Sequence, residues 1–167
     1  MISIRPTDMR DAPILAEIQK QAFLPLYEKY HDAGNPHLRG AEDITCRLDS
    51  PRFRYFTVLE DGVIVGGVMY NICSGSKVFM SELKAGEYYL SRVYIKPQRQ
   101  GRKIAQQAIL LCEREFSDAK VFGVDFPQDL EKNRRCYEGV GFRDTGIRQE
   151  VQPGLVLAFF KKDAETH

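Results

Sequence analysis

A predicted β-strand that runs through a basic, glycine-containing turn into an amphipathic helix constrains the fold of this chain most strongly. The strand covers residues 87–95, the helix covers 101–116 with apolar side chains on one face, and another strand follows at 120–124. Two strands joined through a helix run parallel in one sheet, because the crossover returns the chain to the end where the first strand began. The sequence therefore predicts a β–α–β unit.

The turn between this strand and helix is typical of a pyrophosphate site. The first turn of a helix exposes N–H groups and carries the positive end of the helix dipole, so it attracts a phosphate group. Gly101 lets the backbone approach closely, and Arg99, Arg102 and Lys103 add positive charge. Basic strand-to-helix turns are also frequent on surfaces that bind nothing, so the turn alone does not distinguish the two.

The other expected elements place helices on both faces of a mixed sheet. Asp61-Gly62 between two β-rich runs is a strong signal for a tight hairpin. In chain order, these elements are a strand at 2–5, helices at 6–30 and 41–48, strands at 54–60 and 63–72, a helix at 130–139, and strands at 144–151 and 155–161. This order predicts an α/β fold of the mixed α+β kind. A length of 167 residues fits a single domain, 1–167.

Composition argues against several classes of function. Lys and Arg together number 24 and Asp and Glu 23, and a net charge of +1 does not suit a general nucleic-acid binder. No run approaches the roughly 20 apolar residues of a membrane span. The four cysteines are widely spaced, and no cluster of His, Cys, Asp and Glu has metal-ligand spacing. We therefore expect a cytoplasmic protein without a membrane, nucleic-acid or metal partner.

Three segments of the chain resemble the GNAT superfamily of acetyl-CoA-dependent N-acetyltransferases. They are Leu90-Ser91-Arg92-Val93-Tyr94-Ile95-Lys96-Pro97, Gln100-Gly101-Arg102-Lys103-Ile104-Ala105, and Asn133-Arg134-Arg135-Cys136-Tyr137-Glu138-Gly139-Val140-Gly141-Phe142. The order of elements matches over nearly the whole chain, and the specific motifs lie within 90–142. The resemblance implies a three-layer α/β/α fold with a mixed, centrally splayed sheet. It also implies that an acetyl group moves from acetyl-CoA, a co-substrate, directly to a primary amine in a ternary complex.

The phosphate loop departs from the family pattern at one position. That pattern is Gln/Arg-x-x-Gly-x-Gly/Ala, and its outer positions here are Gln100 and Ala105, while Lys103 stands where a glycine is expected. A positive φ would cost a lysine about 1–2 kcal/mol, so we expect a helical conformation at Lys103. The close approach to phosphate would then depend on Gly101.

The resemblance implies that main chain holds most of the cofactor. The strand ending at Ile95 and the strand near Val124 should splay apart, so that unpaired backbone groups near Val93 and Ile95 bind the pantetheine amides like an added strand. Asn133, one helical turn before Tyr137, would contact the pantetheine arm. The residues expected at the cofactor are Val93, Tyr94, Ile95, Gln100, Gly101, Arg102, Lys103, Ile104, Ala105 and Asn133.

Two side chains are candidates for catalysis. By resemblance, the hydroxyl of Tyr137 lies near the cofactor sulfur. A tyrosine with a pKa of about 10 facing a thiol of about 8.5 is a poor full proton donor, so Tyr137 need only donate a hydrogen bond as charge develops on sulfur. Some family members place a basic glutamate on the strand before the phosphate loop, where this chain has Tyr89. Glu87, two residues earlier on the same face, is the candidate base, Glu82 is a weaker one, and a water chain could replace both.

Several alternatives stay open at this point. A coenzyme A-binding regulatory protein without catalysis is the main one, because the strand glutamate is missing and Lys103 replaces a glycine. A small RNA-binding domain that uses 99–103 is disfavoured by the near-neutral charge. The acceptor is a small-molecule or peptide amine that the sequence does not identify, and the loop residues His31 and His37 could line its pocket. The apolar run 155–160 fits either a homodimer edge or a buried last strand.

Overall fold

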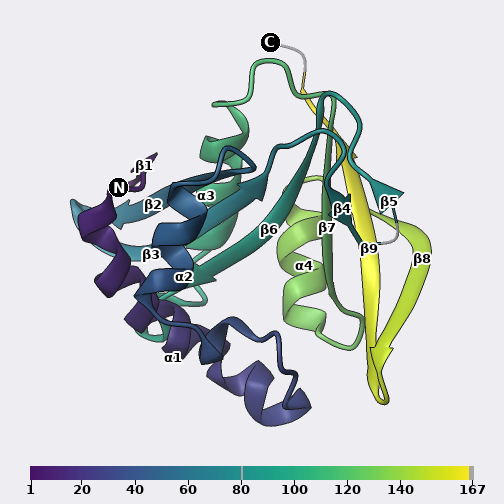
Figure 1. Ribbon diagram of the computed structural model, residues 1–167, viewed down its shortest axis with the longest axis horizontal. Coiled ribbons are helices and arrows are strands. Elements are labelled where there is room, and N and C mark those ends of the chain that lie inside the picture. The colour runs from purple at the N-terminus through teal and green to yellow at the C-terminus, as the bar shows by residue number, and fades with distance from the viewer. Residues whose placement is uncertain (80, 166–167) are drawn as a thin grey trace.

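A seven-stranded mixed sheet with the order β1-β2-β3-β6-β7-β9-β8 forms the centre of the molecule (Figure 1). The computed structural model describes residues 1–79 and 81–165. The strands of this sheet are β1 (Ile2–Pro6), β2 (Phe53–Glu60), β3 (Val63–Asn71), β6 (Glu87–Ile95), β7 (Val121–Pro127), β8 (Arg143–Gln152) and β9 (Leu155–Asp163). β6 and β7 run parallel, as predicted, and the other neighbouring pairs run antiparallel.

Two helices cover each face of the sheet. On one face, α1 (Ala12–Tyr30) and α2 (Ala41–Leu48) pack with residues of β2, β3 and β6, including Met69 and Tyr94. On the other face, α3 (Ile104–Glu113) and α4 (Glu131–Gly139) pack in a larger core with Phe122 and Phe160. The predicted three-layer, mixed α/β fold is therefore confirmed. Short 3-10 helices lie at Met9–Asp11, Pro36–Leu38 and Pro97–Arg99.

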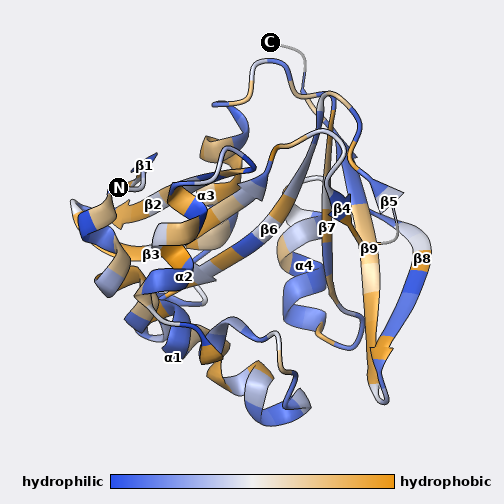
Figure 2. Cartoon of the chain, viewed as in Figure 1, coloured by the Kyte–Doolittle hydropathy of each residue, from blue (hydrophilic) through white to orange (hydrophobic). Residues whose placement is uncertain are grey.

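The hydropathy of each element follows its place in these layers. Figure 2 shows apolar residues concentrated in the inner strands, while β8 and α4 are mostly hydrophilic. β8 is an outer strand whose side chains are largely exposed, and α4 buries Tyr137. A helix that is polar apart from a buried tyrosine suits a position at the rim of a site better than one in a core.

The sheet opens between its two parallel strands. Within the described residues, β6 and β7 pair at Glu87 with Val121, Tyr88 with Phe122 and Tyr89 with Gly123, and no further. β6 nevertheless continues to Ile95 and β7 to Pro127, each paired on its outer side with β3 or β9. The two strands diverge beyond the paired section, and α4 is seen between them (Figure 1). The predicted central splay is confirmed, and it leaves two strand edges without a strand partner.

A small hairpin that the sequence did not predict lies over the paired section. β4 (Lys77–Val78) and β5 (Ser81–Glu82) are too short to show the alternation that marks a strand. Phe79, beside this hairpin, stacks on Phe159 with ring centroids 5.1 Å apart, and Leu83 packs with Phe159 and Tyr89. The β4–β5 hairpin therefore covers the sheet on the face opposite α3 and α4.

Several element boundaries differ from prediction. α3 begins at Ile104 rather than 101, because the residues before it turn in left-handed conformations, and it ends at Glu113. α1 begins at Ala12, since Asp8 caps a separate 3-10 turn ahead of it. β7 extends to Pro127, three residues beyond the predicted end. The last difference brings Asp125 into the strand, where it borders the opening.

Candidate functional site

The turn between β6 and α3 has an irregular backbone. Gly101 has a φ of 82°, and Lys103, the residue before the first turn of α3, has a φ of 61° and a ψ of 21°. The expected helical conformation at Lys103 is therefore wrong. The chain must turn from the end of β6 into α3 within a few residues, and a left-handed residue at the helix N-cap completes that turn. Repeated positive φ angles also gather N–H groups into a concavity that binds anions.

The positive side chains around this turn differ in whether they are paired with a carboxylate. The Nε of Arg99 lies 3.4 Å from Oε1 of Glu60, which partly neutralises its charge. Arg102 and Lys103 are exposed, and within residues 1–79 and 81–165 neither forms an ion pair. Lys132 of α4 also reaches the turn, since its Nζ donates to Oε1 of Gln100 at 3.2 Å. Lys132 is a positive group that the sequence alone did not associate with the site.

Gln100 fixes the turn to the end of β6. Its Nε2 donates to the carbonyl oxygen of Ile95 at 2.9 Å, while its Oε1 accepts from Lys132. Both functional groups of this side chain are thus engaged within the protein. The geometry gives Gln100 a positioning role at the predicted phosphate turn.

The side chains of β6 pack into the two cores and leave main chain at the opening. Val93 and Ile95 belong to the α3/α4 core. Tyr94 points to the α1/α2 core, where its hydroxyl lies 2.5 Å from that of Tyr55. Ile104 and Ala105 likewise face the α3/α4 core, and Ile104 is buried. A molecule in the opening therefore meets the backbone of these residues rather than their side chains.

Tyr137 is held on α4 by aromatic packing. Its ring lies 5.2 Å from that of Phe126 and 5.9 Å from that of Phe142. Burial raises the pKa of Tyr137 well above its usual range, and the nearby Cys136 and Asp125 raise it further, so the hydroxyl stays protonated. Within residues 1–79 and 81–165 no hydrogen bond is formed by this hydroxyl, and it is not among the fully buried polar atoms that lack a partner, so it is not sealed from solvent. Its hydrogen bond remains open to a group within the opening.

α4 is attached firmly to α3. Nε2 of Gln106 donates to the carbonyl oxygen of Cys136 at 3.1 Å. Gly139 is needed for this contact, because a Cβ there would lie 2.3 Å from the same nitrogen. Asn133, predicted to contact the cofactor, is half-buried one turn before Tyr137. Both predicted α4 residues thus lie on a helix whose position is fixed.

Glu87 lies in the paired section of β6, before the strands separate. It is opposite Val121 and lines a narrow crevice beneath the β4–β5 hairpin together with Tyr89 and Phe159. The structure therefore does not bring Glu87 to the open edges. A carboxylate that sequence reasoning missed, Asp125 on β7, does lie there.

Asp125 lies just beyond the end of β6–β7 pairing. Its Oδ2 accepts a hydrogen bond from the Tyr89 hydroxyl, and burial raises the pKa of the carboxyl group. The charge of Asp125 also contributes to the raised pKa of Tyr137. The sequence did hold one signal, since Asp125 interrupts the apolar run Val121-Phe122-Gly123-Val124-Asp125-Phe126. A carboxylate inside a central strand is costly unless something compensates it.

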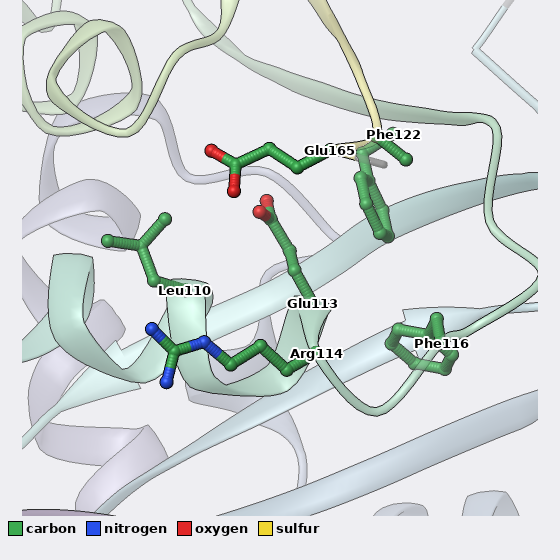
Figure 3. A pocket seen from close by; sticks show the side chains of 7 residues that line it. Leu110, Glu113, Arg114, Phe116, Phe122 and Glu165 are labelled. Atoms are coloured by element: carbon green, nitrogen blue, oxygen red, sulfur yellow. The ribbon is translucent and has the colours of Figure 1, made fainter. Parts of the chain in front are cut away.

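A separate cavity of about 150 Å³ lies at the far end of α3. Figure 3 shows Glu113 and Glu165 beside it, with Arg114 and Phe116 below. The Nζ of Lys162 donates to Oε1 of Glu113 at 2.8 Å, so that carboxylate already has a cation. None of the predicted site residues lines this cavity.

Residues 1–79 and 81–165 contain neither a metal-binding cluster nor a membrane-spanning helix. No group of three or more His, Cys, Asp and Glu side chains there is arranged to hold a metal ion. The same residues contain no helix that is both long and apolar enough to cross a bilayer. Cys46, Cys73, Cys112 and Cys136 are all free thiols.

The site is thus a mixed sheet opened between two parallel strands, with a basic helix N-terminus at the end of one of them. The chain belongs to the acetyltransferase (GNAT) family, whose model matches residues 15–142. No curated protein matches its sequence.

Solved structures share the fold at low sequence identity. The PaiA N-acetyltransferase of Thermoplasma acidophilum, in complex with coenzyme A, is 15% identical with a TM-score of 0.73, covering 98% of this chain and 99% of its own. The ribosomal-protein-S18-alanine N-acetyltransferase of Escherichia coli is 13% identical, with a TM-score of 0.72 and coverage of 100% and 96%. YncA of Salmonella typhimurium, with its cofactor acetyl-CoA, is 17% identical, with a TM-score of 0.74 and coverage of 99% and 95%.

Proposed function

We propose that this protein is an N-acetyltransferase that transfers the acetyl group of acetyl-CoA directly to a primary amine. One observation carries the proposal. The opening between β6 and β7 has an irregular, basic turn at one end and, on α4, the hydroxyl of the buried residue Tyr137, which forms no hydrogen bond within the described residues. Membership of the acetyltransferase family and the fold shared with coenzyme A complexes support it.

The residues present fit coenzyme A. Its pyrophosphate suits the N–H groups of 101–105, with positive charge from Arg102, Lys103 and Lys132. The pantetheine amides suit the open edge of β6 over 90–95, because an amide chain can hydrogen-bond to a strand edge as another strand does. When bound, the thioester supplies an activated acetyl group.

Tyr137 suits the leaving sulfur in this scheme. A thiol with a pKa of about 8.5 leaves as a thiolate, and a hydrogen bond from a neutral hydroxyl stabilises the charge that develops. The raised pKa of Tyr137 keeps the hydroxyl protonated for that hydrogen bond and makes full transfer before bond cleavage unfavourable. We therefore assign Tyr137 assistance of the leaving group.

The acceptor must lose a proton before it attacks. An alkyl ammonium group with a pKa of about 10.4 is mostly charged at pH 7, which opposes the reaction by about 4.6 kcal/mol. The site therefore has to include a proton acceptor or a route to water. Glu87 is the candidate from sequence, although its place in the paired section weakens it.

A test follows from acceptor-dependent thiol release. Wild-type protein with acetyl-CoA should release thiol only when a suitable amine is present, and mass spectrometry should find an N-acetylated product. The amines to try are a peptide with a free N-terminus, Nα-acetyllysine, spermidine and kanamycin. Tight coenzyme A binding without turnover for any of them would favour a non-catalytic regulatory protein. That alternative is motivated by Tyr89, which stands where some family members carry a glutamate, and by Lys103, which replaces a glycine.

A further inference from the structure

We propose that Lys162 on β9 is a positioning residue for the reaction, because it holds the C-terminal end of α4 so that the hydroxyl of Tyr137 faces the opening. The inference rests on the proposed function and deepens it, since it names a residue that acts through Tyr137 without touching substrate. The burial of Lys162, its two hydrogen bonds and the place of one of them on α4 point to this role.

Lys162 is a charged side chain among the apolar residues of the α3/α4 core. It lies opposite Phe122 of β7, and because side chains alternate along a strand, it shares a face of β9 with Phe160. The side chain of Lys162 is only 6% exposed. An ammonium group removed from water is unfavourable unless acceptors surround it. The acceptors that Lys162 reaches must therefore compensate a large cost of desolvation.

Lys162 joins the C-terminal ends of both helices on this face to β9. Its Nζ donates to the carbonyl oxygen of Val140, the C-cap of α4, at 2.5 Å, and to Oε1 of Glu113, the last residue of α3, at 2.8 Å. The carbonyl groups at the end of a helix have no partner within it, and a cation there is favoured by the helix dipole. The same Nζ lies 5.8 Å from the centre of the Phe142 ring, which packs on Tyr137.

Side-chain donors hold α4 on both sides of Tyr137. Nε2 of Gln106 donates to the carbonyl oxygen of Cys136, the residue before Tyr137, and Lys162 donates to that of Val140, three residues after it. Two anchored carbonyl groups restrain both sliding and rotation of the helix between them. A displacement of about 1 Å at a reacting group can lower a rate about 100-fold. The place of the Tyr137 hydroxyl therefore depends on Lys162 as well as on Gln106.

Stability alone does not account for the pair of Lys162 and Glu113. The side chain of Glu113 is 11% exposed, and within the described residues its Oε2 has no hydrogen-bond partner. A buried ion pair that leaves an oxygen unsatisfied is generally no more stabilising than apolar side chains of similar size. Hydrogen bonds have a preferred distance and direction, which apolar contacts lack. An orienting role for Lys162 accounts for a costly charge in this core.

A double-mutant cycle with Tyr137 tests the role. Lys162→Met keeps an unbranched apolar side chain and removes the ammonium group. With the amine that the wild-type protein uses best, kcat should fall about tenfold, because the Tyr137 hydroxyl is no longer held in place. In the Tyr137→Phe background the same substitution should lower kcat less than about twofold, since the hydroxyl that Lys162 positions is already absent. Equal losses in both backgrounds would overturn the role.

An apolar pair separates position from stability. Lys162→Met alone leaves a buried carboxylate without a cation and should lower the urea midpoint, whereas Glu113→Leu with Lys162→Met should restore most of it. The double variant still offers no donor to the Val140 carbonyl, so its kcat should stay about tenfold low. Recovery of kcat together with stability would show a merely structural pair and overturn the role. The double variant also takes the place of Lys162→Met in the cycle if the single variant does not fold.

A lysine outside the core provides the matched control. Lys120 directly precedes β7, and its side chain is exposed. Within residues 1–79 and 81–165 its Nζ forms no ion pair or hydrogen bond. Lys120→Met should therefore change kcat less than about twofold. A tenfold loss in this variant as well would overturn a role specific to Lys162.

Carbon NMR separates this role from the proposed function. The ¹³Cζ resonance of Tyr137 reports on its hydroxyl. It should move when coenzyme A saturates the wild-type protein and stay near its free position in the variant with Glu113→Leu and Lys162→Met. A wild-type protein that binds coenzyme A but acetylates none of the amines overturns the proposed function, and the resonance then decides whether Lys162 positions Tyr137 at the cofactor. Equal movement in the two proteins, or none in either, overturns the role of Lys162.

Discussion

The two sides of the opening present different chemistry. The β6 side offers main chain, in the open strand edge of 90–95 and the irregular turn of 101–103, while its side chains pack into cores. The β7 and α4 side offers the carboxylate of Asp125 and the hydroxyl of Tyr137. Binding through main-chain groups tolerates changes of side chain but depends on the backbone conformation. Function that depends on one side-chain oxygen is lost when that atom is removed. Substitutions on the two sides should therefore separate binding from turnover.

The largest effect is expected on the side-chain half. Tyr137→Phe removes the hydroxyl and keeps the ring that packs on Phe126 and Phe142, so the fold and coenzyme A affinity should persist. We expect kcat to fall about 100-fold, since assistance to the leaving group is lost. Steady-state kinetics with calorimetric measurement of coenzyme A binding gives both quantities.

A second tyrosine provides the control for that substitution. Tyr88 packs on Phe116 with centroids 4.9 Å apart, and its hydroxyl donates to Asp118, away from the opening. Tyr88→Phe should leave kcat within about twofold, the small effect expected where no reacting group is touched. Equal kcat values for Tyr137→Phe and wild type would remove Tyr137 from the reaction.

A smaller effect is expected when the backbone of the turn is strained. Gly101→Ala adds a Cβ that meets no atom within 4 Å, so its cost comes from the φ of 82° alone. A penalty of about 1–2 kcal/mol should weaken coenzyme A binding about tenfold through a shifted turn, with kcat at saturation unchanged. Gly146→Ala on β8 has the same φ of 82° and open space, and it should lower stability without changing affinity. Equal affinity losses in both variants would contradict a local effect.

The smallest effects are expected at Lys103. Lys103→Gly relieves a left-handed lysine at the N-cap of α3, so the free energy of unfolding should rise by about 0.5–1 kcal/mol. Lys103→Ala loses the charge but keeps the strain, and it should not be stabilised. Denaturant unfolding compares the two variants, and coenzyme A affinity should change about threefold or less in each, because main chain provides most of the contact. A destabilised Lys103→Gly variant would show that the lysine makes a contact that favours the fold.

The elements of the fold could be predicted because their signals are local. The turn at Asp61-Gly62 and the apolar periods of the strands predict elements within a few residues of those observed. Two strands joined through a helix run parallel in one sheet, which predicts the pairing of β6 with β7. The resemblance of 90–105 and 133–142 to family motifs predicts that these two strands splay apart. The β4–β5 hairpin was missed, because two-residue strands carry no period and form through packing on Phe159 and Tyr89.

The chemistry of the opening was harder to predict, because it depends on contacts between distant segments. Asp125 and Tyr89 are 36 residues apart and meet only where β6 and β7 separate. Lys132 reaches Gln100 across a similar separation, from α4 to the turn. Local propensity favoured a helical conformation at Lys103. The residue is instead left-handed, because the chain has to turn there from the end of β6 into α3. The sequence thus predicted where the open strand edge and the turn lie, whereas the contacts of Asp125 and Lys132 were not predicted.

Amide hydrogen exchange with and without coenzyme A tests the central claim most directly. If the cofactor adds to the open edge of β6 and rests on the turn before α3, the amides over 90–95 and 101–105 should become protected. Amides of β1 and of the cavity at the far end of α3 should not change. Tight binding without protection of 90–95 and 101–105, or with protection at the far end of α3 instead, would contradict the account.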